Sequence, residues 1–316
     1  MTRTPARAGA GALSVVAVAA LALGLSSCNA VGSNAATVNG SDITRADYER
    51  DLKALAANPS LLGLTGGTQF SIQGDAARSW LSQLIAWRAA ENILADRGVS
   101  VSADTKKQFD DQLKGNDAAQ KLPKSMLDEI VDGAASVQTL AQQPAPTKDE
   151  LAKLYADAPA STGAMCLRHI LVKTKAEAQD VLHELEGGAD FATVAKERSI
   201  EPAAKTTGGA LTGTDGNACI PISTYQSDYD ETFVTGALAA RPGVPTDPVQ
   251  SHFGWHVILA RPFDEVSGDL VKLVGSPPTD AGPPYALRGA LGTADVTIDP
   301  RYGRWDQIKS DVVSLH

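Results

Sequence analysis

The sequence predicts an α+β fold, in which a mostly α-helical module precedes a mixed domain and a tail that returns to the module. Two observations support this prediction. Before about residue 158, apolar residues recur at three- and four-residue spacing, which is typical of amphipathic helices. After Pro159, short apolar segments suited to strands alternate with helical segments in the order β-α-α-(α)-β. A chain of 316 residues is long enough for two modest domains.

The first 27 residues have the pattern of a secretory signal peptide. Arg3 and Arg7 precede an apolar stretch that is interrupted by glycine and serine, so a transmembrane helix is the less favoured interpretation. The stretch ends in Leu25-Ser26-Ser27-Cys28, which resembles a bacterial lipobox. We therefore expect Cys28 to carry a lipid anchor on the outer face of the bacterial cell membrane. The alternative is an ordinary cleavage site with an incidental cysteine.

Composition limits the partners and the redox chemistry. Removal of residues 1–27 would take away two of the 28 basic residues and none of the 37 acidic ones, which leaves a net charge of −11 and disfavours nucleic acid as a partner. Once Cys28 is assigned to lipid, Cys166 and Cys219 remain. Outside the cytoplasm they could form a disulfide or stay two separate thiols, and sequence alone does not decide between these alternatives.

The helical module is expected to span residues 36–158, after a short tether at 28–35. Ala36–Ile43 predicts a strand, an Asn-Gly turn and a return strand, followed by a helix that Thr44 caps. A loop is expected from Asn58 to Gly74. Further helices are expected at 75–97, 103–114, 124–142 and 148–156, the last of which begins with a capping box.

The mixed domain is expected at 164–263, and the tail at 264–316. Its first strand is predicted at Met165–Val172 and its last at Trp255–Ala260, with helical segments between them at 175–186, 190–198 and 228–238. The tail contains two Pro-Pro pairs, which are loop signals. It also contains the strand-like segment Ala294–Ile298, and we expect this segment to pair with the strand that begins at Ala36.

Four motifs in the mixed domain resemble, in family order, the parvulin (PpiC or rotamase) family of peptidyl-prolyl cis–trans isomerases. They are Arg168–Lys173, Gly187–Ala195, Ser199–Leu211 and His252–Ile258. The resemblance implies a four-stranded antiparallel sheet flanked by helices, and an activity that assists the folding of exported polypeptides containing X-Pro bonds. The preceding helices resemble, more loosely, the chaperone module of SurA- and PrsA-type secreted foldases. The alternatives are a holdase chaperone with a weak or inactive parvulin domain, and a scaffold with neither activity.

The resemblance also assigns site residues. The two histidines of the family correspond to His169 and His256, on the first and last strands, and are expected to be neighbours. The position that is Cys or Asp in the family falls on Glu201, which keeps the negative charge and adds a methylene; a solvated loop carboxylate is the alternative. The substrate-binding residues would be Leu211, Tyr225, Tyr229, Phe233 and Phe253, although Phe233 could equally belong to a helix core.

Other chemistries are not expected. Rotation about an X-Pro bond crosses a barrier of roughly 18–20 kcal/mol without breaking a covalent bond, so no cofactor is needed. No spacing suited to metal ligands occurs, and there is no phosphate-binding loop. Ser199 and Ser251 are expected to lack the base and the orienting group that an activated serine requires, which argues against hydrolysis. His183 shares a helix with two glutamates and is expected to face solvent.

Overall fold

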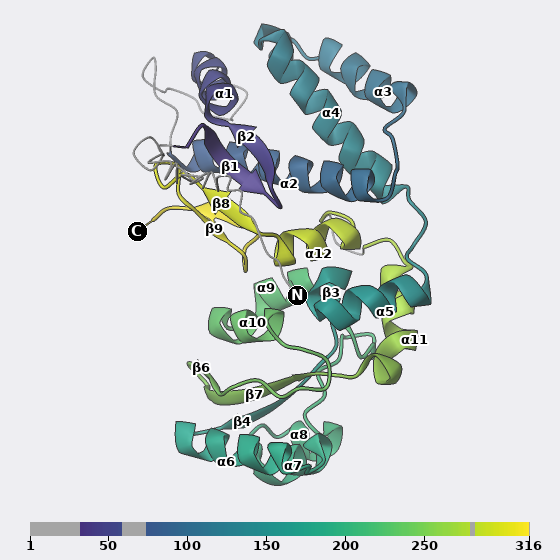
Figure 1. Ribbon diagram of the computed structural model, residues 1–316, viewed down its shortest axis with the longest axis vertical. Helices are drawn as coiled ribbons and strands as arrows, with labels where there is room; N and C mark the ends of the chain where they lie inside the picture. The colour runs from purple at the N-terminus through teal and green to yellow at the C-terminus, as the bar shows by residue number, and fades with distance from the viewer. Residues whose placement is uncertain (1–31, 59–73, 279–281, 316) are drawn as a thin grey trace, which may run out of the picture. The chain divides into compact units, whose positions relative to one another are not determined.

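A small antiparallel sheet joins segments from the two ends of the described chain (Figure 1). The computed structural model describes residues 32–58, 74–278 and 282–315. β1 (Asn34–Val38) and β2 (Ser41–Thr44) form a hairpin around Asn39 and Gly40, whose φ angles of 49° and 81° suit an Asn-Gly turn. β8 (Val296–Ile298) pairs antiparallel with the other edge of β1. The predicted pairing of the tail strand with the first strand is therefore confirmed.

The predicted tether extends too far along the chain. Asn34 and Ala35 belong to β1, and Ala35 is fully buried. The carbonyl oxygen of Ala35 also accepts a hydrogen bond of 2.9 Å from the amide of Asp299. Small side chains suit a tether and a closely packed strand equally well, so composition does not separate the two. Residues 1–31, with the expected signal peptide and Cys28, and the expected loop at 59–73 lie outside the described residues.

The helices of the module lie where the sequence predicts them, within two residues at each end. They are α1 (Arg45–Ala57), α2 (Gly74–Asp96), α3 (Ala103–Lys114), α4 (Lys124–Ala141) and α5 (Lys148–Asp157), with a short 3-10 turn at Ala119–Lys121. Thr44 caps α1 by accepting a hydrogen bond from the amide of Asp47, and Thr147 forms the expected capping box with Glu150. None of the described helices is long and apolar enough to cross a membrane.

The tail is more structured than the sequence suggests. It forms α11 (Phe263–Val274), α12 (Tyr285–Thr293) and a hairpin of β9 (Arg304–Asp306) and β10 (Asp311–Val313). The Pro-Pro pair before α12 marks a helix start, because the fixed φ and missing N–H of proline are tolerated there. Leu287, Leu291 and Val312 are buried in the same core as the apolar side of α2. The tail therefore completes the helical module.

The mixed domain contains a three-stranded antiparallel sheet in the order β4-β7-β6. β4 spans Leu167–Val172, β6 Val249–Ser251 and β7 Gly254–Ala260, while β3 (Ala164–Met165) pairs separately with β5 (Ile220–Pro221). In place of a fourth long strand, the sheet has isolated bridges, which include one between Arg168 and Ala210 beside β4. Gly208 and Gly209 precede this bridge with φ angles of 61° and 76°, which an extended strand does not accommodate.

Helices cover both faces of this sheet (Figure 1). One face packs against α6 (Lys175–Glu186) and α7 (Phe191–Arg198), with the short α8 (Ala204–Thr207) beside α7. The other face packs against α9 (Ile222–Asp228) and α10 (Glu231–Leu238). A 3-10 turn at Pro159–Thr162 joins α5 to β3. Because side chains alternate along a strand, residues 167, 169 and 171 share the face toward α9 and α10.

A disulfide ties this domain together near its first strands. Cys166 and Cys219 are bonded, with their Cα atoms 4.1 Å apart, and both are buried. The bond connects the junction of β3 and β4 to the residue before β5. Of the two alternatives that the sequence leaves open, the structure has the disulfide.

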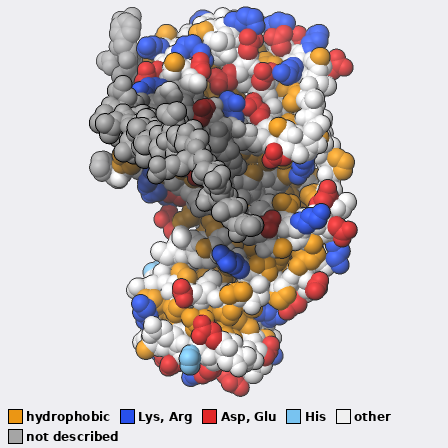
Figure 2. All heavy atoms as spheres, viewed as in Figure 1, with side chains coloured by type: hydrophobic (Ala, Val, Ile, Leu, Met, Phe, Trp, Pro, Cys, Tyr) orange, Lys and Arg blue, Asp and Glu red, His pale blue; other side chains and the backbone are white. Residues whose placement is uncertain are grey.

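Charged and apolar side chains are distributed unevenly over the face shown in Figure 2. Lys, Arg, Asp and Glu side chains of both signs crowd the helices at the top, where α3 and α4 lie in Figure 1. Apolar side chains gather lower down on this face, over the region of the sheet and its helices. Exposed apolar surface of this kind is where binding sites are to be sought.

Candidate active site

The register of β4 and β7 brings two buried histidines together. His169 pairs with Ile258 and Leu171 pairs with His256, so the two histidines are diagonal neighbours on the face toward α9 and α10. Their rings stack with centroids 5.4 Å apart and an interplanar angle of 15°. The two Nδ1 atoms are 3.1 Å apart, so one of them donates a hydrogen bond to the other. The two imidazoles therefore cannot both be fully protonated without placing two N–H groups face to face.

Polar groups continue this pair at both ends. Glu201 Oε2 lies 2.6 Å from His169 Nε2, and Ser251 Oγ lies 2.8 Å from His256 Nε2. The contact between Glu201 and His169 has an ion-pair distance but not the alignment of a good hydrogen bond. The result is a continuous series, Glu201, His169, His256 and Ser251, that crosses the sheet from the loop after α7 to β6.

The two ends of this series determine which atom donates and which accepts in each of its hydrogen bonds. The N–H of His169 that faces Glu201 is the largest influence on its pKa and holds that pKa below the usual range, so the ionised carboxylate accepts hydrogen bonds and donates none at neutral pH. His169 then carries its proton on Nε2, and its Nδ1 accepts one from His256. The remaining nitrogen of His256, Nε2, accepts a hydrogen bond from the Ser251 hydroxyl. This assignment follows from the hydrogen-bonding capacity of each group.

Ser251 does have a histidine neighbour, contrary to the sequence-based expectation. The hairpin between β6 and β7 pairs Ser251 with Gly254 and turns the hydroxyl toward His256, which spacing along the chain does not reveal. Burial, together with the neighbouring His169, lowers the pKa of His256 to about 4. A histidine with this pKa is a weak base, so it does not activate Ser251 as a nucleophile at neutral pH. Ser199, the other serine considered, accepts hydrogen bonds from the amides of Leu171 and Glu201.

Three aromatic residues on α9 and α10 form a wall over the histidines. We call Tyr225, Tyr229 and Phe233 the aromatic wall. Phe233 lies edge-on to His169 and His256, with ring centroids 5.5 Å and 5.1 Å apart. Tyr229 stacks on Phe233 at 5.4 Å, and Tyr225 follows at 4.8 Å from Tyr229. Leu211 packs against the same apolar cluster.

The predicted substrate-binding residues separate into three groups. Leu211 and Tyr229 are partly exposed, so they can offer an apolar surface to a ligand, and the buried Phe233 lies beside them against the histidines. Tyr225 is fully buried and its hydroxyl donates to the carbonyl of Met165, so it supports the wall from behind and does not contact a substrate. The assignment of Tyr225 to direct binding is therefore wrong.

Among the described residues, the ring of Phe253 has no contact with the aromatic wall. Its side chain is 63% exposed and its ring contacts that of His252, with centroids 3.8 Å apart. Phe253 precedes Gly254, whose φ angle of 142° favours glycine at this turn. Asp230, the cap of α10, lies 2.5 Å from Nδ1 of His252, and this contact fixes the turn beside the site.

Part of the chain is similar to known proteins. Residues 169–261 match the family model described as "Rotamase: PPIC-type PPIASE domain". A "Foldase protein PrsA" from Clostridium kluyveri is 47% identical over 94 residues, which are 30% of this chain and 25% of the relative. Another from Clostridium acetobutylicum is 33% identical over 180 residues, 53% of this chain and 47% of the relative. The chain thus spans between a quarter and about half of the length of these curated relatives.

The chain is also similar to solved structures, with low TM-scores. The crystal structure of PrsA from Bacillus subtilis has a TM-score of 0.28 and 22% sequence identity, and the match covers 82% of this chain and 91% of that one. A SurA-like chaperone structure from Campylobacter jejuni has a TM-score of 0.26 and 24% identity, covering 76% of this chain and 89% of that one.

Proposed function

We propose that this chain, whose residues 169–261 form a parvulin-type domain, is a peptidyl-prolyl cis–trans isomerase that assists the folding of exported polypeptides. The domain match and the relatives named foldase protein PrsA support this proposal. The observation that carries it is the stacked histidine pair, with Glu201 at one end and Phe233 edge-on to both rings. The site has no activated nucleophile and is bordered by the aromatic wall. Such a site suits a reaction that breaks no covalent bond.

The geometry supports a mechanism based on binding the twisted amide. The planar X-Pro amide is stabilised by resonance, and water stabilises its polar planar form further. In the proposed mechanism, Leu211, Tyr229 and Phe233 bind the proline ring and exclude water from the amide. The histidine pair forms the rigid floor that holds the chain as the bond rotates. A site that fits the twisted form better than either planar isomer lowers the barrier.

Glu201 has a defined place in this proposal. Its ionised carboxylate lies against His169 and is partly exposed toward the site. A fixed negative charge near the substrate carbonyl disfavours the planar amide, because resonance places partial negative charge on the carbonyl oxygen and twisting removes it. Glu201 would thus act together with the apolar wall, as the Cys or Asp of the family is expected to do.

We also propose that the chain is anchored outside the cytoplasm through a lipid on Cys28. The lipobox-like sequence before Cys28 supports this proposal. The buried Cys166–Cys219 disulfide supports only the location outside the cytoplasm, because structural disulfides persist mainly in oxidising compartments. Membrane fractionation and labelling with a radioactive fatty acid test the anchor. Cys28→Ser should lose the label, and the protein should move to the soluble fraction. If the variant keeps the label and stays in the membrane fraction, the assignment is refuted.

The activity is tested by following isomerisation of an Xaa-Pro peptide, with a protease-coupled assay and by exchange NMR. His169→Ala and His256→Ala should each lower kcat/KM by about tenfold or more, which corresponds to at least about 1.4 kcal/mol of transition-state stabilisation. His183→Ala is the matched control, because the His183 side chain is 92% exposed on α6. Equal rates with and without the wild-type protein would refute the proposal.

A holdase chaperone with a weak isomerase domain is the second candidate. A cavity of about 670 Å³ favours it, because apolar side chains of α2, α4, α5, α11 and α12 contribute to its lining. Examples are Ile93, Leu140, Leu151, Val274 and Tyr285. The full-length double variant His169→Ala/His256→Ala separates the candidates. Suppression of the aggregation of an unfolded protein by this variant, together with a negligible rate on the peptide in wild type, would favour the holdase.

A further inference from the structure

The hairpin of β9 and β10 is rooted in the helical module. Its two strands pair antiparallel, with Asp306 opposite Asp311. Val312 is buried in the core that α2 shares with the tail, and its amide donates a 2.8 Å hydrogen bond to Ser82 Oγ on α2. The base of the hairpin is therefore held by the module and not by the isomerase domain.

The tip of the hairpin, residues 307–310, has a defined conformation. The carboxylate of Asp306 accepts hydrogen bonds of 3.1 Å from the amides of both Ile308 and Lys309. Ser310 closes the turn with a φ angle of 49°. Gln307 donates a hydrogen bond to the carbonyl of Gly292 on α12, so the tip and α12 form one continuous layer.

This tip contacts both helices that carry the aromatic wall. Ile308 packs against the apolar cluster that contains the wall. Lys309 Nζ lies 2.9 Å from a carboxylate oxygen of Glu231, the first residue of α10. Gln226 on α9 donates a 3.3 Å hydrogen bond to Ser310 Oγ. The contacts to α9 and α10 lie on either side of Tyr229, which joins the two helices.

The wall is thus supported from behind by a segment outside the isomerase domain. Figure 1 shows α9 and α10 between α12 and the sheet that holds β4 and β7. On α12, Arg288 donates to Ser223 of α9, and a Cβ added to Gly292 would lie 3.4 Å from Ile222 Cδ1. Helices as short as α9 and α10 take their position from packing rather than from intrinsic stability.

We infer that Ile308 and Lys309 are positioning residues for the isomerase site, although they lie outside residues 169–261. By holding α9 and α10, they set the distance of Phe233 and Tyr229 from the histidine pair. The same contacts connect the helical module to the site, because the hairpin is rooted in that module. The inference rests on the proposed isomerase function for its kinetic test. Small displacements of groups that orient a substrate can change rates by as much as about a hundredfold.

The kinetic test uses the full-length protein with Ile308→Ala, Lys309→Glu and the combination of both. We expect kcat/KM to fall by about threefold to tenfold for the combination, while the cooperative unfolding transition is retained. Lys53→Glu is the matched control, since Lys53 is an exposed lysine on α1 and the charge change is identical. Restoring opposite charges with Lys309→Glu/Glu231→Lys should return kcat/KM to within about twofold of wild type.

A spectroscopic test is independent of activity. The ring of Phe233 is edge-on to both imidazoles, so its ring current affects the NMR shifts of His169 and His256. Those shifts should move in Ile308→Ala and in Lys309→Glu, return in the charge-swapped double variant, and stay in place in Lys53→Glu. Unchanged shifts in a folded Ile308→Ala/Lys309→Glu protein would overturn the inference. If wild type has no isomerase activity, the proposed function fails, and the shifts alone decide whether these residues position the wall.

Discussion

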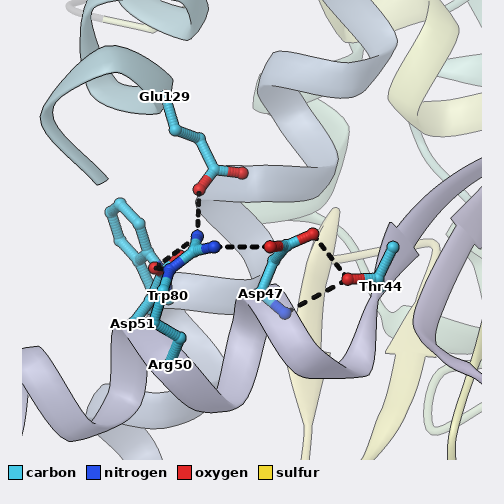
Figure 3. Close-up of polar contacts among 6 residues, drawn as sticks. All are labelled: Thr44, Asp47, Arg50, Asp51, Trp80 and Glu129. Carbon is cyan, nitrogen blue, oxygen red and sulfur yellow. Dashed lines mark hydrogen bonds and ion pairs between the residues drawn. The ribbon is translucent and has the colours of Figure 1, made fainter. Parts of the chain in front are cut away.

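Glu129 on α4 is partly buried beside another carboxylate at the contact between α4 and α1 (Figure 3). Asp51 on α1 is fully buried and accepts hydrogen bonds from Arg50, at 2.9 Å, and from Trp80, at 3.4 Å. The same guanidinium also binds Asp47 and reaches Glu129 Oε2 only at 3.8 Å. One cation therefore serves three carboxylates. Burial, followed by the charge of Asp51, raises the pKa of Glu129 to about 7.

The raised pKa predicts the direction in which pH changes stability. An unfolded glutamate has a pKa near 4.5. Between this value and about 7, the folded protein binds more protons than the unfolded chain, so the free energy of unfolding falls as the pH rises. The difference corresponds to at most about 3.4 kcal/mol. The Glu129 side chain is 27% exposed, and solvent screening reduces this to about 2 kcal/mol.

Glu129→Gln keeps the shape of the side chain and removes the charge. At pH 8 the variant should be more stable than wild type by about 2 kcal/mol, and at pH 4.5 the two should differ by less than about 0.5 kcal/mol. Urea unfolding followed by circular dichroism at pH 4.5, 6, 7 and 8 measures both. Asp128→Asn is the control, since Asp128 is an exposed neighbour paired with Lys124. Other charged groups line the same hollow and are unchanged in both variants: Arg88, Glu91 and Asp132.

Either of two results would refute this reasoning. If Glu129→Gln is less stable than wild type at pH 8, the attraction between Glu129 and Arg50 outweighs the repulsion from Asp51. An unaltered pH profile in the variant would likewise mean that Glu129 titrates at an ordinary pH in the folded protein.

Three further predictions concern the disulfide, the histidine pair and the tail. Replacing both Cys166 and Cys219 by alanine should lower the free energy of unfolding by about 4 kcal/mol, from their separation of 53 residues; an unchanged urea midpoint would contradict this. His256 has a lowered pKa of about 4 when folded, so between pH 6.5 and 4 the unfolded chain binds more protons and stability should fall as the pH falls; a profile equal to that of His256→Gln would contradict this assignment. Leu291→Ala should cost about 3 kcal/mol in unfolding monitored by tryptophan fluorescence, whereas a loss below about 1 kcal/mol would show that the tail contributes little to the core.

Local signals in the sequence predict much of this fold. The capping box at Thr147 and the apolar periodicity of α2 define helices whose ends agree with the structure to within two residues. These features depend on neighbouring residues only. The strand at 296–298 was also predictable, because a strand that has no local partner must pair with a distant one. The proximity of His169 and His256 follows from motifs on the first and last strands.

What the sequence does not reveal depends on contacts between distant segments. The sequence does not reveal α12, because the Pro-Pro pair that precedes it signals a loop and a helix start alike. The burial of Tyr225 and the exposure of Phe253 depend on how α9 and the turn at Gly254 sit on the sheet. The contact between Ser251 and His256 arises from the register of a hairpin. Each of these requires the packed structure, since residue type and spacing are compatible with either outcome.

The pairing of β1 with β8 affects the order in which the parts of the chain fold. The mixed domain is an insertion within the helical module, because residues 287, 291 and 312, which follow it in the sequence, are buried in the module's core. A polypeptide delivered from its N-terminal end presents β1 long before β8. Contacts within the inserted domain close shorter loops and can form first. The inserted domain would therefore be assembled before the helical module that flanks it in the sequence.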